Sequence, residues 1–255
     1  MRDFETIIFK VDGPVAFIVM NRPDKHNAIS LQMLRELRDA FLQAEADDLI
    51  NVMVLTGSSS KTFSSGIDLA GGILDEASGI TESMLRDLVP LLECMEQCSK
   101  LIIGSVEGAA IGLGCSLALQ CDLLVMSSNA SLNLAFSKLG LIADGGVNWQ
   151  LPKKVGYNRA LQMVLEADVL DAKRCQELGI ANKIVNEQDM SREVTRWARN
   201  LAGKATLPQG YTKQLMRSAM AGSSLLETVR SEARLQAVCA DTRFFKKAYA
   251  GILGR

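Results

Sequence analysis

The sequence predicts an α/β fold in which parallel strands alternate with helices, followed by a mainly helical C-terminal third. Three observations support this prediction. Short apolar runs recur along the first half of the chain, helical periodicity separates them, and helical spacing dominates after Asn148. No Pro-, Gly- or Ser-rich linker and no charge block divides the 255 residues, so one domain with one large core is expected.

An antiparallel hairpin is expected at the start of the chain. Residues 5–11 and 15–20 are β-rich runs, and the Asp-Gly-Pro sequence between them is typical of a turn. Ser30 can cap a helix that follows, because a serine oxygen accepts from the free N–H groups of a first helical turn. Its apolar side chains share one face: Leu31, Leu34, Leu37, Phe41 and Ala44. Residues 50–55 then form an apolar run typical of a buried strand.

The alternation continues through the middle of the chain. The pattern indicates a helix at 81–97, a strand at 101–106, a helix after Gly114 and a strand at 122–126. Strands joined through helices favour parallel pairing. The uneven spacing of Val54, Ile103 and Val125 gives no fixed repeat period.

The C-terminal part of the chain shows helical spacing of apolar residues. The residues concerned are Leu161, Val164 and Leu165, then Trp197 and Leu201, then Leu225, Val229 and Leu235. A helical layer is therefore expected to cover the sheets.

Charge and composition exclude several classes of function. The 28 Lys and Arg residues balance 29 Asp and Glu residues, so no broad field attracts nucleic acid or an anionic membrane. Six cysteines without a Cys-x-x-Cys pair, and the single histidine His26, argue against a metal site. The N-terminus lacks the pattern of a signal peptide, and the apolar stretch 108–121 is too short and glycine-rich to span a membrane. A cytoplasmic protein with unpaired thiols is expected.

Two glycine-containing segments, 63–69 and 108–115, share one design. Each follows a predicted strand and introduces a turn in which glycine permits positive φ angles and close approach. A helix that starts near Leu113 would direct free N–H groups and its positive dipole end at an anion. Two such amides can form an oxyanion hole. Neither segment has the pattern of a phosphate loop or a dinucleotide-binding turn, which disfavours nucleotide hydrolysis and hydride transfer.

Several motifs, taken in order, resemble the enoyl-CoA hydratase/isomerase (crotonase) superfamily. They are NRPDKHNA at 21–28, the segments 63–69 and 108–122, the Leu-Gly-Leu of 139–141, and FFKK at 244–247. The resemblance implies a spiral of strand-strand-helix turns over residues 1–190 and a helical trimerisation region over 191–255. It also implies an acyl-CoA thioester substrate and a homotrimer or dimer of trimers. No separate cofactor is implied, because coenzyme A is part of the substrate.

The resemblance implies that backbone N–H groups of Ile67 and Leu113 hold the thioester carbonyl oxygen. Gly66 and Gly112 precede these residues in the same two turns and are implied to lie against the substrate. Phe136 is expected to form part of the wall of the acyl pocket.

A coenzyme A site follows from the same resemblance. The loop containing Lys25, Asn27 and Ala28 corresponds to one beside the adenine. Ser65 and Asp68 correspond to positions near the pantetheine or behind the first amide.

Two basic positions have less specific implications. Lys246 or Lys247 corresponds to a contact with the coenzyme phosphates, within a subunit or across a boundary, and a solvated basic helix is the alternative. His26 is interpreted as a solvated loop residue and not as a catalyst.

The acid and base positions differ from those of water-adding members of the superfamily. Ser116 and Phe136 stand where the hydratases that the chain resembles carry two glutamates, and neither side chain is a competent proton carrier at neutral pH. Asp144, in the sequence LGLIADGG, instead resembles the acid of the isomerase branch. Apolar neighbours such as Ile142, Phe136 and Trp149 are expected to desolvate its carboxylate and raise its basicity.

These features favour an isomerase that converts a 3-enoyl-CoA to the 2-enoyl isomer, with Asp144 moving one proton. A 1,2-epoxyphenylacetyl-CoA isomerase is a second interpretation. Hydration through an unconventional acid such as Glu107 and a catalytically silent protein that binds CoA esters are two others. By itself, the Asp-Gly-Gly sequence would equally suit an ordinary turn or helix cap.

Overall fold

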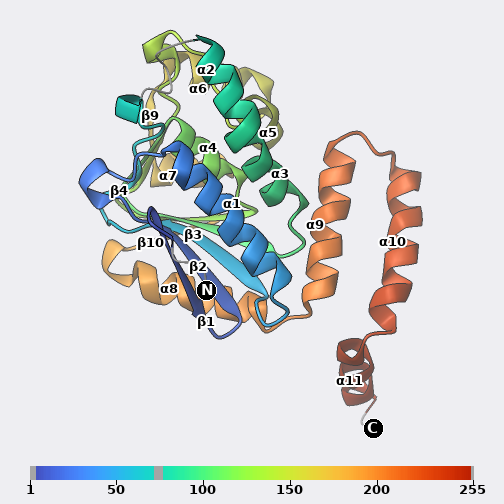
Figure 1. Cartoon of the computed structure of the whole chain (residues 1–255). Coiled ribbons are helices and arrows are strands. Elements are labelled where there is room, and N and C mark those ends of the chain that lie inside the picture. Colours follow the sequence, from blue (N-terminus) through green and yellow to red (C-terminus); the bar gives the residue numbers. More distant parts are fainter. Residues whose placement is uncertain (1–3, 72–76, 254–255) are drawn as a thin grey trace.

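Two β-sheets form the body of the protein, and helices pack around them (Figure 1). The computed structural model describes residues 4–71 and 77–253. The larger sheet has the order β1-β2-β3-β5-β7-β10. Its strands are β1 Ile7–Asp12, β2 Val15–Met20, β3 Val52–Gly57, β5 Leu101–Val106, β7 Leu123–Ser127 and β10 Lys183–Val185. β1 and β2 pair antiparallel and the other neighbours pair parallel, which confirms the predicted hairpin and the parallel crossovers.

The smaller sheet has the order β4-β6-β8-β9 and was not predicted. Its strands are β4 Thr62–Ser64, β6 Ala109–Ile111, β8 Ser131–Asn133 and β9 Val169–Asp171. Each has only three residues, too few for an alternating pattern to stand out. β4, β6 and β8 each follow a long strand of the larger sheet and precede helical structure. The implied spiral of strand-strand-helix turns is therefore confirmed.

Unequal helical connections hide this repeat in the sequence. The connection from β4 to β5 contains α2 Ala77–Ser83, the π-helix η3 Met84–Leu88 and α3 Val89–Gln97. The corresponding connection from β6 to β7 contains only α4 Leu113–Gln120. Turns of equal role thus differ in length, which explains the uneven spacing of their strands.

Helices cover both faces of the larger sheet. α1 Leu31–Ala46 begins at the predicted cap, where Ser30 Oγ accepts a hydrogen bond from the N–H of Met33. Successive residues of β3 point to opposite faces: Met53 joins the core cluster that includes α1, α3 and α4, whereas Val54 joins the cluster beneath α8. α8 Met190–Ala202 packs there through buried Met190, Val194, Ala198 and Ala202.

The remaining helical segments complete the chain. They are η1 Pro23–Lys25, η2 Leu69–Gly71, η4 Ser137–Leu139, α5 Val147–Val155, α6 Tyr157–Glu166, α7 Ala172–Glu177, η5 Glu187–Asp189, α9 Thr206–Met220, α10 Leu225–Ala240 and α11 Arg243–Ile252.

α9, α10 and α11 project to one side of the body (Figure 1). The expectation that a C-terminal helical layer covers the sheets is therefore wrong beyond α8. α10 and α11 contain no buried residue. Helical spacing identifies an apolar face but cannot specify which surface will cover it. The division of the chain at residue 190 stays a prediction.

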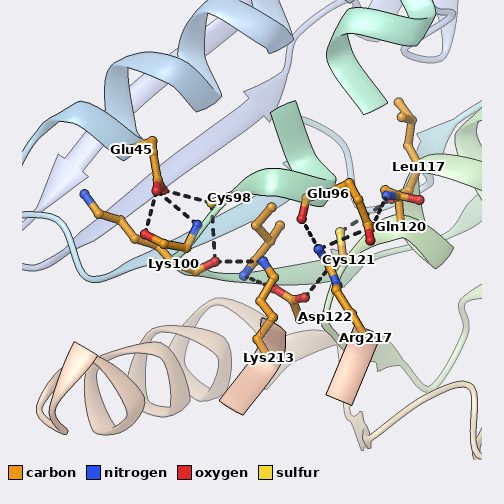
Figure 2. Close-up of polar contacts among 12 residues, drawn as sticks. Glu45, Glu96, Cys98, Lys100, Leu117, Gln120, Cys121, Asp122, Lys213 and Arg217 are labelled. Carbon is orange, nitrogen blue, oxygen red and sulfur yellow. Dashed lines mark hydrogen bonds and ion pairs between the residues drawn. The ribbon is translucent and has the colours of Figure 1, made fainter. Parts of the chain in front are cut away.

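A buried ionic cluster attaches α9 to the body (Figure 2). The Nζ of Lys213 lies 2.8 Å from Asp122 Oδ2, and it also donates to the backbone oxygen of Lys100. Arg217 Nη2 lies 2.9 Å from Asp122 Oδ1, and its Nη1 donates to the backbone oxygen of Glu96. Asp122 thus neutralises two cations at the base of the projecting arm, which consists of α9, α10 and α11.

In the two described ranges, no helix is both long enough and apolar enough to cross a membrane. All six cysteines are free thiols, which agrees with the expectation of unpaired cysteines. The cytoplasmic location stays a prediction.

We predict that Asp122→Asn will lower the free energy of unfolding by about 3 kcal/mol, because removing one member of a buried ionic cluster leaves desolvated charge uncompensated. Equilibrium urea unfolding at fixed protein concentration measures this change. Asp241→Asn, which removes the exposed ion pair between Asp241 and Lys246, is the control and should have no measurable effect. Equal stability of the two variants would contradict a role for Asp122 in holding the arm.

Candidate active site

A cavity of about 280 Å³ lies where the two predicted glycine turns meet. Gly66 and Ile67 of the first turn line it, as do Gly112 and Leu113 of the second. Most of the other walls are apolar side chains, including Leu34, Met84, Leu88, Phe136 and Ile142. Asp144 is the only titratable side chain among the described residues that line this cavity.

The first turn directs the Ile67 amide away from the backbone beside it. Gly66 has a φ of 94°, and a Cβ there would lie 2.9 Å from the backbone oxygen of Ile111. The carbonyl of Gly66 accepts from the Ile29 N–H, and the Asp68 N–H donates to the Ile29 carbonyl. This parallel bridge uses the groups on either side of Ile67, so the Ile67 N–H itself points away from Ile29.

The second turn presents the amide of Leu113. Gly112, with a φ of 51°, immediately precedes α4, and Leu113 is the first residue of that helix. An N–H in the first helical turn has no acceptor within the helix and lies at the positive end of its dipole. A Cβ built on Gly66 would lie 3.6 Å from the Leu113 nitrogen. The structure thus brings the two amides that the sequence singled out to one cavity wall, and their catalytic role stays a prediction.

Ser64 and Asn27 hold the first turn in place. Ser64 Oγ donates to the Asn27 carbonyl at 2.8 Å and accepts from the Gly66 N–H at 3.2 Å. Asn27 is fully buried, and its Nδ2 donates to the carbonyls of Thr62 and Phe63. The side chain of Asn27 therefore ties its loop to β4. Ser64 was missed at the sequence level, although it stands within the glycine segment.

The loop around residue 25 lies against the outer side of the same turn. Lys25 and His26 are exposed, and the His26 carbonyl accepts from the Ser65 N–H at 3.0 Å. Ser65 Oγ contacts the carbonyl of Lys25 at 3.5 Å. The predicted loop position of His26 is confirmed. Binding of coenzyme A by Lys25 and Ser65 stays a prediction.

An ion pair that was not predicted links this loop to the first turn. Arg22 Nη1 lies 2.8 Å from Asp68 Oδ2 and donates to the Ala28 carbonyl at 2.7 Å. Asp68 follows Ile67 directly, so the pair supports the segment that carries the first amide. Arg22 stands in the same 21–28 motif as Lys25, and this motif was the sequence signal that could have identified it.

Asp144 carries a half-buried carboxylate, one oxygen of which is buried and unpaired. Its Oδ1 is shielded from solvent and has no hydrogen-bond partner among the described residues. Burial raises the pKa of Asp144 to about 6. Phe136 and Ile142 line the same cavity, as predicted, although much of Ile142 also faces solvent. A desolvated carboxylate of this kind is suited to accept a proton at neutral pH.

The prediction that Trp149 helps to desolvate Asp144 is wrong. Trp149 is 49% exposed and lines a different cavity, of about 620 Å³, between α9 and the body. The Nζ of Lys153 lies 3.1 Å from its ring centroid. One helical turn separates these two side chains on α5, so they pack together on a face directed away from Asp144.

Two other candidate residues lie outside the cavity. Glu107 is half-buried, and burial together with the nearby charge of Glu187 raises its pKa, but it is not part of the cavity lining. Lys246 is exposed on α11, where its Nζ lies 2.6 Å from Asp241. Within one chain Lys246 is therefore far along the projecting arm (Figure 1).

Comparisons with known proteins agree with this architecture. A family model described as enoyl-CoA hydratase/isomerase matches residues 10–252. The 1,2-epoxyphenylacetyl-CoA isomerase of Escherichia coli K12 is 32% identical over 244 residues, which cover 94% of this chain and 93% of that protein. The 4-chlorobenzoyl coenzyme A dehalogenase-2 of an Arthrobacter species is 34% identical over 232 residues, covering 90% and 82%. A crystal structure of an enoyl-CoA hydratase from Polaromonas sp. JS666 matches with a TM-score of 0.91 at 26% identity, covering 97% and 96%.

We predict a pH-dependent effect of Asp144→Asn on stability. The folded-state pKa of about 6 lies above the ordinary value of 3.8, so the contribution of protonated Asp144 is fully present below about pH 3.8 and is lost as the pH rises through 6. Between pH 5 and pH 8 the free energy of unfolding of the variant should therefore rise relative to wild type by about 1.4 kcal/mol.

Urea unfolding at the two pH values measures this difference. Asp241→Asn is the control, because Lys246 lowers the pKa of that exposed carboxyl and no such rise is expected. A difference between Asp144→Asn and wild type that does not change with pH would show that Asp144 is not the desolvated acid described above.

Proposed function

The chain belongs to the enoyl-CoA hydratase/isomerase family and has the crotonase fold, and on that premise we propose that it converts a 3-enoyl-CoA to the 2-enoyl isomer with Asp144 as its single acid and base. One observation carries the proposal. Asp144 is the only titratable side chain among the described residues that line the cavity, and its one buried oxygen, Oδ1, has no hydrogen-bond partner.

The proposed reaction uses the two amides and the carboxylate in sequence. The thioester oxygen accepts hydrogen bonds from Ile67 and Leu113, and Asp144 takes a proton from C2. The C–H electron pair forms the C1–C2 double bond of a dienolate, whose charge rests on the held oxygen. Each fixed donor of such a hole contributes about 3 kcal/mol to the stability of the charged state.

Asp144 then returns the same proton at C4. The electron pair of the C3–C4 double bond takes the proton, the C2–C3 double bond forms, and the carbonyl is restored. A pKa of about 6 suits both steps, since the group is ionised at neutral pH and its acid form still donates readily. Coenzyme A enters as part of the substrate, and the proposed reaction requires no separate cofactor.

The composition of the cavity favours proton transfer by one group over hydration by two. Addition of water needs a base for the water and an acid for the α-carbon, but Asp144 is the sole titratable group in the described lining. Phe136 stands at one of the two positions where the hydratases that the chain resembles carry a glutamate, and here it forms part of the cavity wall. Glu107 lies outside the cavity, which disfavours the hydration route suggested for it.

Isomerisation of 1,2-epoxyphenylacetyl-CoA is the second candidate function. The E. coli relative that carries this name matches 94% of the chain. The apolar cavity with one carboxylate suits an aromatic acyl group as well as an aliphatic one. The non-enzymatic alternative is a catalytically silent protein that binds CoA esters and does not convert them.

The projecting arm supports the proposal that the protein assembles as a homotrimer or a dimer of trimers. α10 and α11 expose large apolar side chains, including Leu225, Leu226, Val229, Phe244 and Tyr249. Two helices that expose large apolar side chains and bury none within the chain favour contact with another protein surface. In such an assembly Lys246 would reach the coenzyme phosphates of a neighbouring subunit. We propose a cytoplasmic location for the assembled enzyme.

We predict that the purified protein isomerises a 3-enoyl-CoA and that Asp144→Asn lowers kcat by about 10³-fold, because general acid–base catalysis contributes 10² to 10⁴-fold. The log of kcat/KM should fall as the pH drops below about 6, where Asp144 becomes protonated. Absorbance of the conjugated 2-enoyl thioester follows the reaction.

Glu107→Gln is the matched control and should keep wild-type turnover. An Asp144→Asn variant with wild-type turnover would contradict the one-base mechanism. If wild type binds the thioester without turnover, the epoxide is assayed next, and inactivity with both substrates would favour the silent binding protein.

We also predict that Lys246→Ala raises the KM for the thioester by about tenfold without changing kcat, because a hydrogen bond to a charged group contributes about 1.5–3 kcal/mol. Arg243→Ala, on the same helix, tests whether loss of any positive charge there has this effect. Steady-state kinetics and sedimentation give KM and the assembly state together. An unchanged KM in Lys246→Ala would remove this residue from the proposed coenzyme site.

A further inference from the structure

We propose that Ser116 is a positioning residue that ties the loop carrying Asp144 to the helix carrying the Leu113 amide. This inference rests on the proposed function, because it concerns how the base is placed relative to the oxyanion donor. Ser116 is not part of the cavity lining, so it acts through Asp144 and not on the substrate.

The hydroxyl of Ser116 bridges two segments that are far apart in the sequence. Ser116 is 1% exposed and lies one helical turn after Leu113 on α4. Its Oγ lies 2.9 Å from the backbone oxygen of Asp144 and 3.3 Å from that of Gly112. A hydroxyl has one hydrogen to donate, and the shorter contact goes to the loop.

The carboxylate of Asp144 is held only through its backbone and its packing. Among the described residues no side chain forms a hydrogen bond or an ion pair with it, and Oδ1 is buried without a partner. The Asp144 carbonyl accepts from Ser116 at 2.9 Å and, at a longer 3.4 Å, from the Val147 N–H. Of these two hydrogen bonds to the Asp144 carbonyl, the one from Ser116 is therefore the shorter.

The loop rests directly on the same turn of α4. Gly145 has a φ of 64°, and a Cβ there would lie 2.6 Å from Ser116 Cβ and 2.9 Å from Leu113 Cδ1. On the other side, Asn148 Nδ2 donates to the Ala143 carbonyl at 2.6 Å. Asp144 is thus attached on both sides, and Ser116 provides the link to the helix that begins with Leu113.

This link places the proton carrier relative to the held carbonyl. When the thioester oxygen is bound at the Leu113 amide, the positions of C2 and C4 follow from the bond lengths of the substrate. One carboxylate must reach both carbons, and a displacement of about 1 Å can cost 10²-fold in rate. Because α4 carries both the donor and the serine, one rigid helix holds the donor and the anchor of the loop that bears the base.

The test compares Ser116→Ala with Ser127→Ala. Ser116→Ala keeps the Cβ that packs against Gly145 and removes the hydrogen bond. We expect kcat to fall about 10 to 100-fold, with the KM for the 3-enoyl-CoA unchanged. Ser127 is equally buried on β7 and bonds Asn129, and its replacement should leave kcat unchanged.

Two further readouts separate positioning from loss of folded protein. With substrate deuterated at C2, Ser116→Ala should return less label to C4, because a looser carboxyl exchanges with water before it donates. Amide hydrogen exchange over residues 143–147 should accelerate in Ser116→Ala and not in Ser127→Ala, and this readout does not depend on turnover. Ser116→Cys, which keeps a weak donor, should lie between serine and alanine, and it takes the place of Ser116→Ala if that variant does not fold.

If Ser116→Ala keeps the wild-type kcat, label return and amide exchange, the inference is overturned. A loss of kcat in Ser127→Ala equal to that in Ser116→Ala would also overturn it. Asp144→Asn in the same assays distinguishes the two proposals. An active Asp144→Asn variant contradicts the proposed function. An inactive Asp144→Asn beside a normal Ser116→Ala contradicts only the role of Ser116.

Discussion

The close packing of two backbone segments, the turn that follows β4 and the loop before α5, against β6 and the first turn of α4 is the constraint on which the site depends. At Gly66, Gly114 and Gly145 an added Cβ would lie less than 3.0 Å from Ile111, Ser64 and Ser116 respectively, so no side chain could be inserted without displacing backbone. Glycine at these positions lets the turn after β4 and the loop before α5 reach the helix. Two amides and one carboxylate consequently line a single small cavity.

Electrostatics then gives that cavity its chemical character. The Leu113 amide costs little to leave unpaired at a helix start, where solvent or a ligand can satisfy it. The carboxylate of Asp144 is different, because desolvation raises its pKa and makes its ionised form unfavourable in the folded protein. Sites that retain such groups exchange some stability for reactivity. An apolar wall on one side and polar anchors behind the loop allow this group to persist.

Charge is used in the opposite way where α9 leaves the body. There Asp122 is surrounded by Lys213 and Arg217, and their mutual neutralisation fixes the base of the arm (Figure 2). Beyond that point α10 and α11 bury nothing within the chain. The arm is therefore attached at its root and leaves its apolar faces available to other surfaces.

The sequence by itself determined the features that depend on local signals. The hairpin, the Ser30 cap, the parallel strands and the two glycine turns follow from periodicity and turn chemistry within a few residues, and the motif order led to the correct family. The tertiary structure alone decided the three-residue strands, the burial of Asn27, the bond from Ser116 to Asp144, the outward orientation of Trp149 and the departure of the arm. These depend on contacts between residues far apart in the chain, and a local pattern shows that a face is apolar without showing what will cover it.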